Sequence, residues 1–106
     1  MILTTSATIP GHTITEWKGL VKGNTIRARH VGKDIMAGLR TLIGGEIKEY
    51  TAMMAQSREE SLLRMIEEAQ ELGANAVTDV RFTTSMVMSN TSEILAFGTA
   101  VVAVKG

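Results

Sequence analysis

The sequence predicts an α+β fold, a two-layer β-α-β-β subunit with one long helix packed on a mainly antiparallel sheet. Three observations predict it: apolar residues recur at helical spacing over 46–72, alternate over 76–88 and run almost unbroken over 93–104. The chain of 106 residues has the size of one domain, which we take as 1–106. Residues 1–12 are predicted to form an N-terminal arm.

The arm holds the first signals along the chain. Residues 2–5 can form a very short strand, and Pro10-Gly11 marks a turn.

Two short strands are predicted next. Residues 13–22 place apolar side chains among polar ones, with a bulge expected at Gly19. Gly23-Asn24 is a turn signal, and 25–31 then alternates apolar residues with arginines. We therefore expect a second strand with a basic face.

The apolar period becomes helical after this point. A helix is predicted over 33–43 and is expected to stop at Gly44-Gly45. A second helix is predicted from Glu46 to Leu72, capped by Gly73 in the left-handed conformation. Its length of about 40 Å is large for so small a domain. We expect part of it to extend over a neighbouring subunit.

The long helix has two distinct faces. Its inner stripe is predicted to contain Ile47, Tyr50, Met54, Leu62, Met65, Ile66, Ala69 and Leu72. The opposite surface holds Glu59, Glu60, Glu67, Glu68 and Glu71, and the pairs Glu60–Arg64 and Arg64–Glu68 have the spacing for ion pairs along the helix. This pattern predicts that one face of the helix packs on the sheet and that the opposite face is exposed to solvent.

Two more strands end the chain. Residues 76–88 alternate, 89–92 form the turn, and 93–104 are almost wholly apolar, as a strand with neighbours on both sides should be. The C-terminal strand is therefore placed at the centre of the sheet, between 13–22 and 76–88. The helix becomes the crossover between the two outer strands.

Composition excludes several classes of protein. There is no cysteine, so disulfides, thiolate metal sites and cysteine nucleophiles are absent. No segment approaches the ~20 apolar residues of a membrane span, and no secretion signal is present, so a cytoplasmic protein without membrane contact is expected. Nucleic-acid binding lacks the basic excess and stacking aromatics it usually needs.

Charge is divided unevenly although the net charge is zero. Residues 1–45 carry six basic and two acidic side chains, and the remainder carries five basic and nine acidic ones. Four aromatic residues leave a sparse core. Both features favour association between copies, with solvated faces as the alternative for the charges.

Several motifs, taken in order, give the chain a resemblance to the YbjQ-like family, an uncharacterised family that carries a heavy-metal-binding label. The motifs are Thr4-Thr5, Ile9-x-Gly11, Gly19-x-Val21-x-Gly23, Asp34-x-x-Ala37-Gly38, Gly44-Gly45, Tyr50, Arg58, Leu72-Gly73-Ala74-Asn75-Ala76-Val77 and Gly98-Thr99-Ala100-Val101. The resemblance implies a dodecin-like subunit. It also implies a homo-oligomeric ring, with a pentamer expected, in which short strands join neighbours.

Arg58 is the first candidate site residue. It lies four residues after Met54 and four before Leu62, which places it on the predicted inner stripe. A buried guanidinium needs a partner, so we expect Arg58 to pair with Asp34, within or between subunits. The alternative is a ligand-binding arginine.

A second candidate is an anion site. Gly44-Gly45 precedes a predicted helix N-terminus, where backbone N–H groups can hold an anion, and Arg40 is nearby. Tyr50 opens the same helix and could line a pocket. A plain helix–helix turn is the alternative for the two glycines, and no nucleotide-binding fingerprint is present.

Metal binding is the third hypothesis. His12 and His30 are the only histidines and would need carboxylates to complete a divalent-metal site, for instance one shared across a ring. The leading prediction is thus a non-enzymatic homo-oligomer that binds a small molecule or anion at subunit interfaces. The alternatives are a metal-binding protein and, last, an enzyme with an interfacial site, since no catalytic motif or cofactor site is identified.

Overall fold

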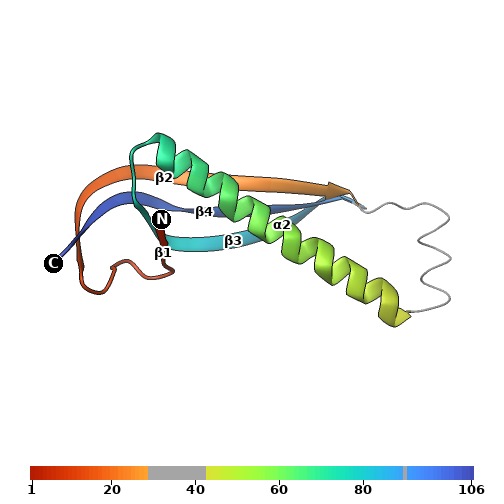
Figure 1. Cartoon of the computed structure of the whole chain (residues 1–106). Coiled ribbons are helices and arrows are strands. Elements are labelled where there is room, and N and C mark those ends of the chain that lie inside the picture. The colour runs from red at the N-terminus through yellow and green to blue at the C-terminus, as the bar shows by residue number, and fades with distance from the viewer. Residues whose placement is uncertain (29–42, 90) are drawn as a thin grey trace.

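The computed structural model describes residues 1–28, 43–89 and 91–106, with side chains described outside 28–50. In chain order the elements are β1 (Ile2–Leu3), β2 (His12–Ala28), α2 (Ile43–Glu71), β3 (Ala76–Met88) and β4 (Thr91–Lys105). Figure 1 shows α2 lying diagonally across one face of the sheet. The predicted α+β architecture is therefore confirmed.

The sheet has the strand order β1-β3-β4-β2. β4 pairs antiparallel with both β2 and β3, whereas β1 pairs parallel with β3. The C-terminal strand is central, as its apolar sequence predicts. It begins at Thr91, two residues before the expected boundary.

The strand β2 is continuous, so the predicted turn at Gly23-Asn24 is wrong. Gly23 pairs with Ala96 of β4 in a part of the ladder, from Gly19 to Ala28, that has no register shift. A Cβ built on Gly23 would lie 2.3 Å from the Ser61 carbonyl oxygen and 2.4 Å from the Met65 backbone nitrogen. Glycine is needed here because α2 crosses β2 in backbone contact, and not because the chain reverses.

The predicted bulge at Gly19 is present. The β2–β4 register shifts between Trp17 and Gly19, and Gly19 has a φ of 113°. A second irregularity lies in β3 between Thr78 and Arg81, where Asp79 has a φ of 55°. Such bulges re-aim the side chains that follow them.

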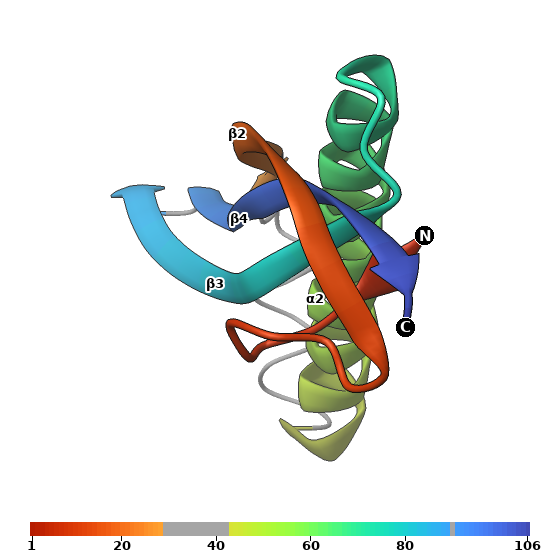
Figure 2. The same ribbon diagram turned by 90° about the vertical axis from the view of Figure 1, so that its left-hand side faces the viewer.

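The N-terminal arm continues the sheet past β3. The N–H of Thr4 donates to the Val77 carbonyl at 3.0 Å, and the N–H of Val80 donates to the Thr4 carbonyl at 3.0 Å. The N–H of Asp79 donates to the Ser6 carbonyl at 3.1 Å. The turn at Pro10-Gly11 then returns the chain to β2, and Figure 2 shows this loop beneath the sheet. The arm therefore covers the edge of β3 as far as Val80.

The helix α2 includes Gly44 and Gly45, so the start predicted at Glu46 is wrong; the other predicted helix, over 33–43, lies outside the described residues except for Ile43. The two glycines fall in the first turn of α2, where N–H groups have no intrahelical partner, and glycine is tolerated at an end better than in an interior. The other end matches the prediction: Gly73 has a φ of 82°, its N–H donates to the Gln70 carbonyl, and the Ala74 N–H donates to the Ala69 carbonyl. This is a Schellman cap.

The face of α2 on the sheet differs from the predicted stripe. Its buried residues are Ser57, Ser61, Met65 and Ala69, spaced by four. Met65 and Ala69 were predicted, but the two serines were not, and Leu72 is exposed. Small side chains line the contact because β2 approaches the helix backbone so closely at Gly23.

Two apolar clusters lie on opposite faces of the sheet. The cluster under α2 contains Val21, Met65, Ala69, Ala74, Val77, Val80, Ala96 and Ala100. The other, beneath the arm, contains Ile9, Ala76, Val101 and Ala103, with Ile14 packed against it. Each face is thus covered over only part of its length.

The chain is elongated, with principal extents of 57 × 22 × 17 Å. Its radius of gyration is 17.6 Å. A compact chain of this length would have a radius of about 13 Å. Much surface is therefore left for other contacts. Over the described residues, no helix combines the length and apolar character needed to cross a membrane.

Candidate functional site

Most of the predicted ligand-binding residues are not brought together in the described structure. Asp34 and Arg40 lie outside the described residues, as does His30. Gly44, Gly45 and Tyr50 belong to the first part of α2. The anion and Arg58–Asp34 hypotheses therefore remain predictions.

Arg58 is exposed, so its predicted burial on the inner stripe is wrong. Apolar spacing did not reveal this, because the buried face of α2 includes the polar residues Ser57 and Ser61. That shift turns Arg58 toward the flank of α2. Within the described parts of the chain its guanidinium forms no salt bridge.

The helix is tied to β2 by charged and polar side chains. Arg27 of β2 forms a salt bridge with Glu60, and its Nε donates to Ser57 Oγ at 2.9 Å. Arg64 donates to the Asn24 carbonyl oxygen, and the Lys22 N–H donates to Glu68 Oε1 at 3.3 Å. The predicted pairs Glu60–Arg64 and Arg64–Glu68 are thus replaced by contacts across to β2.

Beneath these contacts lies a buried hydroxyl cluster. Thr25 Oγ1 lies 3.2 Å from both the Ser57 carbonyl oxygen and Ser61 Oγ. Ser61 Oγ also lies 3.1 Å from the Ile94 carbonyl oxygen. Among the described residues no buried side-chain polar atom lacks a partner, so the cluster is internally satisfied and offers no open ligand position.

A different feature is open: the second half of β3. The arm ends its pairing at Val80, and Arg81–Met88 are exposed on both faces. Phe82, Met86, Val87 and Met88 are the large apolar side chains of this stretch, and Met86 is 73% exposed. A long unpaired edge with apolar side chains is a template for pairing with another chain.

The opposite border of the sheet is also open. β2 is the terminal strand in the order β1-β3-β4-β2, so its outer edge has no neighbour among the described strands. Trp17, Leu20 and Ile26 of this strand are exposed. The sheet therefore has two unlike free edges, one at each side.

A shallow depression adjoins the open half of β3. It has a volume of about 420 Å³ and is lined by Leu3, Thr4, Thr5, Leu62, Val80 and Phe82. None of these side chains is charged. The depression lies where arm, helix and β3 meet, and it suits an apolar group better than an anion.

A metal site finds no support in the described side chains. In this part of the chain no three His, Asp or Glu side chains cluster as metal ligands. His12 Nδ1 is engaged with the Pro10 carbonyl oxygen at 2.9 Å, which leaves one ring nitrogen. Divalent transition metals prefer three or four such ligands, and the described residues do not supply them.

These observations define a class: a helix-over-sheet subunit in which, among the described residues, the outer edge of β2 and the second half of β3 have no strand partner. Comparison with known proteins then shows that the chain belongs to the YbjQ family, whose model, described as "Putative heavy-metal-binding", matches residues 1–104. The resemblance noted from the sequence is therefore confirmed.

Relatives occur in bacteria and archaea. A UPF0145 protein of Dehalococcoides mccartyi is 59% identical over 102 residues, covering 96% of this chain and 98% of the relative. One of Archaeoglobus fulgidus is 56% identical over 101 residues, covering 95% and 94%.

A solved structure shares the fold. It is a Pediococcus pentosaceus protein of unknown function from the DUF74 family, with a TM-score of 0.69, 18% identity and 96% of each chain covered. This likeness bears on the fold alone.

Proposed function

We propose that this protein is a self-assembling module, a homo-oligomeric ring whose subunits join through their sheet edges. The observation that carries the proposal is the pair of unlike free edges, the outer side of β2 and Arg81–Met88 of β3. The resemblance to YbjQ-like proteins makes a pentamer the expected ring.

The two edges favour a ring over a two-fold dimer. A two-fold contact joins an edge to its own copy, so it would leave the other edge open. A head-to-tail contact joins β3 of one subunit to β2 of the next and covers both edges with one interface. Such a contact closes into a ring when its rotation allows.

A lysine in the open half of β3 should weaken the assembly. We expect Met86→Lys to shift the protein toward monomer at micromolar concentration, with affinity at least ~10-fold lower, because a buried unpaired charge is costly. Sedimentation velocity measures the shift. Gln70→Lys places the same side chain on an exposed position of α2 and should leave the assembly unchanged. A wild-type monomer at this concentration would contradict the proposal.

A second proposed role is binding of a small ligand at the subunit boundary. The depression beside Phe82 favours it, because it is apolar and adjoins the free edge. We expect the neutral fluorophore N-phenyl-1-naphthylamine to bind there. Phe82→Ala should lower its affinity at least ~3-fold through lost apolar contact, whereas Leu63→Ala, at an exposed position of α2, should not. Equal fluorescence titrations for both variants would contradict this role, provided sedimentation shows the same assembly.

A further inference from the structure

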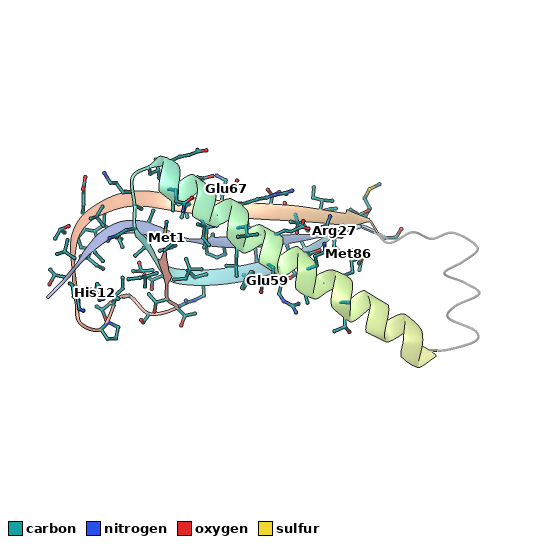
Figure 3. All side chains as sticks on the ribbon, viewed as in Figure 1. Met1, His12, Arg27, Glu59, Glu67 and Met86 are labelled. Carbon is teal, nitrogen blue, oxygen red and sulfur yellow. The ribbon has the colours of Figure 1, made fainter. Side chains whose placement is uncertain are left out.

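The face of the sheet opposite α2 is covered over only part of its length. The arm covers it at one end, where Ile9 lies in a buried cluster with Val101 and Ala103. Figure 3 shows His12 at this end of the sheet and Met86 toward the other end. Toward that second end no described helix or strand lies on this face.

The strand β2 shows which side chains lie on the uncovered face. Val21, Gly23 and Thr25 are buried beneath α2. Successive residues of a strand point to opposite faces, so the alternate residues from Leu20 to Ile26 point to the uncovered face. Leu20 and Ile26 are 66% and 57% exposed. Two large apolar side chains are therefore left in water on this face of the sheet.

Leu95 lies at the middle of the uncovered part of this face. It pairs with Asn24 of β2 and with Thr83 of β3, which gives one row of three residues across the sheet. The uncovered part of β4 runs from Thr91, where the strand begins, to Thr99, beyond which the arm covers it. The uncovered face therefore extends equally far on either side of the Leu95 row.

The rows on either side carry opposite charges. Lys22 and Arg81 flank Phe97 in the row toward the arm, and Glu93 lies in the row toward the turn between β3 and β4. These are the only charged side chains in the three rows. Within the described chain neither cation forms a salt bridge, although Arg81 donates to two backbone carbonyls. Glu93 accepts one hydrogen bond, from Asn24.

We propose that two copies of the chain pack these faces together about a two-fold axis, with antiparallel strands and with their Leu95 rows opposite each other. The row of Lys22 and Arg81 in each copy then lies opposite the row of Glu93 in the other. Packed sheets lie about 10 Å apart, which these long side chains can span. The contact uses a face of the sheet and not an edge, so it goes beyond the proposed ring and does not depend on it.

Charge and length select a second copy, in this direction, as the occupant. Turned about Leu95, the β3–β4 turn of one copy reaches the arm of the other, so the two uncovered stretches match end for end. A two-fold contact with parallel strands would instead set each charged row against its own copy, which is repulsive. The antiparallel contact also removes Leu20, Ile26 and Phe97 from water.

The size of the face predicts a weak dimer. Three strands about 4.8 Å apart and nine residues, Thr91 to Thr99, that each rise about 3.3 Å give a projected face on the order of 400 Å² per copy. Accessible area exceeds projected area, so two copies bury about 1,000 Å², the lower limit for a specific interface. We therefore expect the dimer to be populated at about 100 μM and not at nanomolar concentration.

Cysteine cross-linking tests the axis, because the chain has no cysteine of its own. We expect Thr83→Cys and, separately, Asn24→Cys to give covalent dimers with a short bismaleimide, since each residue lies opposite its own copy. Ser85→Cys is the matched control, exposed on the same strand and the same face as Thr83. It lies about 13 Å from its own copy along the strand and should give at least ~5-fold less dimer. No single edge contact brings both β2 and β3 against their own copies.

Sedimentation equilibrium tests the charges. The Met86→Lys background is used because that substitution is expected to remove the edge assembly. We expect Glu93→Lys to weaken dimerisation at least ~5-fold, because it sets a third cation against Lys22 and Arg81. Adding Lys22→Glu restores a pair of opposite charges and should regain most of the loss. Circular dichroism and the midpoint of urea unfolding at one concentration show whether each variant folds.

Each outcome decides. Dimers cross-linked at Thr83 and Asn24 but not at Ser85 support the two-fold contact. Equal cross-linking at Thr83 and Ser85, or none at Thr83 in a folded chain at about 100 μM, overturns it and leaves the face to a different partner. A double variant K22E/E93K that associates no better than Glu93→Lys overturns the charge pairing. If Met86→Lys leaves the higher assembly intact, the edge proposal fails instead, and cross-linking still decides the face contact.

Discussion

Replacing Gly23 with valine is expected to cost the fold about 3 kcal/mol or more, a large share of the 5–15 kcal/mol of a typical domain. The reason is that the first added carbon already meets backbone. A Cβ at this position would lie 2.3 Å from the Ser61 carbonyl oxygen and 2.4 Å from the Met65 nitrogen. A side chain can rotate away from a collision, but here the whole helix must move off the sheet.

The measurement is urea unfolding at one protein concentration, since stability of an assembling chain depends on concentration. Lys22→Ala is the matched control, because Lys22 is the exposed neighbour of Gly23 in the same strand. Ser61→Gly, combined with the valine, should not restore stability, because the closest atoms belong to the helix backbone. If Gly23→Val were as stable as Lys22→Ala, α2 and β2 would not be in backbone contact at Gly23.

Gly23 also shows why part of the fold could not be predicted from the sequence. Gly-Asn is a turn signal because both residues tolerate the left-handed region. The same glycine can instead provide room for a crossing helix, and the sequence of β2 alone does not contain that helix. Gly19 was interpreted correctly because a bulge is a local feature of its own strand. Local features and the strand order of the main sheet were predictable, and the close crossing of α2 over β2 was not.

The burial of Arg58 was predicted wrongly for a related reason. Apolar spacing placed Arg58 on the inner stripe because Met54 and Leu62 lie four residues to either side of it. The structure reverses the two: Ser57 and Ser61 are buried, and Arg58 is exposed. Their hydroxyls are satisfied by carbonyl oxygens and by Thr25, so burial does not require an apolar side chain. A stripe of small residues four apart was the signal that could have identified the contact face.

What the sequence did indicate about association follows from the same surfaces. The length of the helix, the sparse core and the unequal charges of the two halves all favour a chain completed by neighbours. In the structure Arg27–Glu60 joins the basic half to the acidic half within one chain. Of the other exposed charges on α2, Arg58 and Glu59 lie on the side of Leu62, and Glu67 and Glu71 lie on the side of Glu60.

Met65→Ala is expected to destabilise the chain by about 2–5 kcal/mol, the range for truncating a buried long side chain. Met65 is 0% exposed and lies in the cluster between α2 and the sheet, with Val21, Ala69 and Ala96. Its neighbours are mostly alanine and valine, so few flexible side chains can collapse into the space that the thioether leaves. The loss should therefore fall toward the upper part of that range.

Two controls separate this cavity effect from the general effect of shortening an apolar side chain on α2. Leu63→Ala lies two residues away on the same helix, where Leu63 is 58% exposed, and should change stability by no more than ~1 kcal/mol. Met65→Leu nearly conserves volume and should cost less than ~1.5 kcal/mol. If Met65→Ala and Leu63→Ala lost the same free energy of unfolding in urea, the packing of Met65 against the sheet would not stabilise α2. The expected ranking would show that α2 is held on the sheet by its packing over Gly23 and Met65.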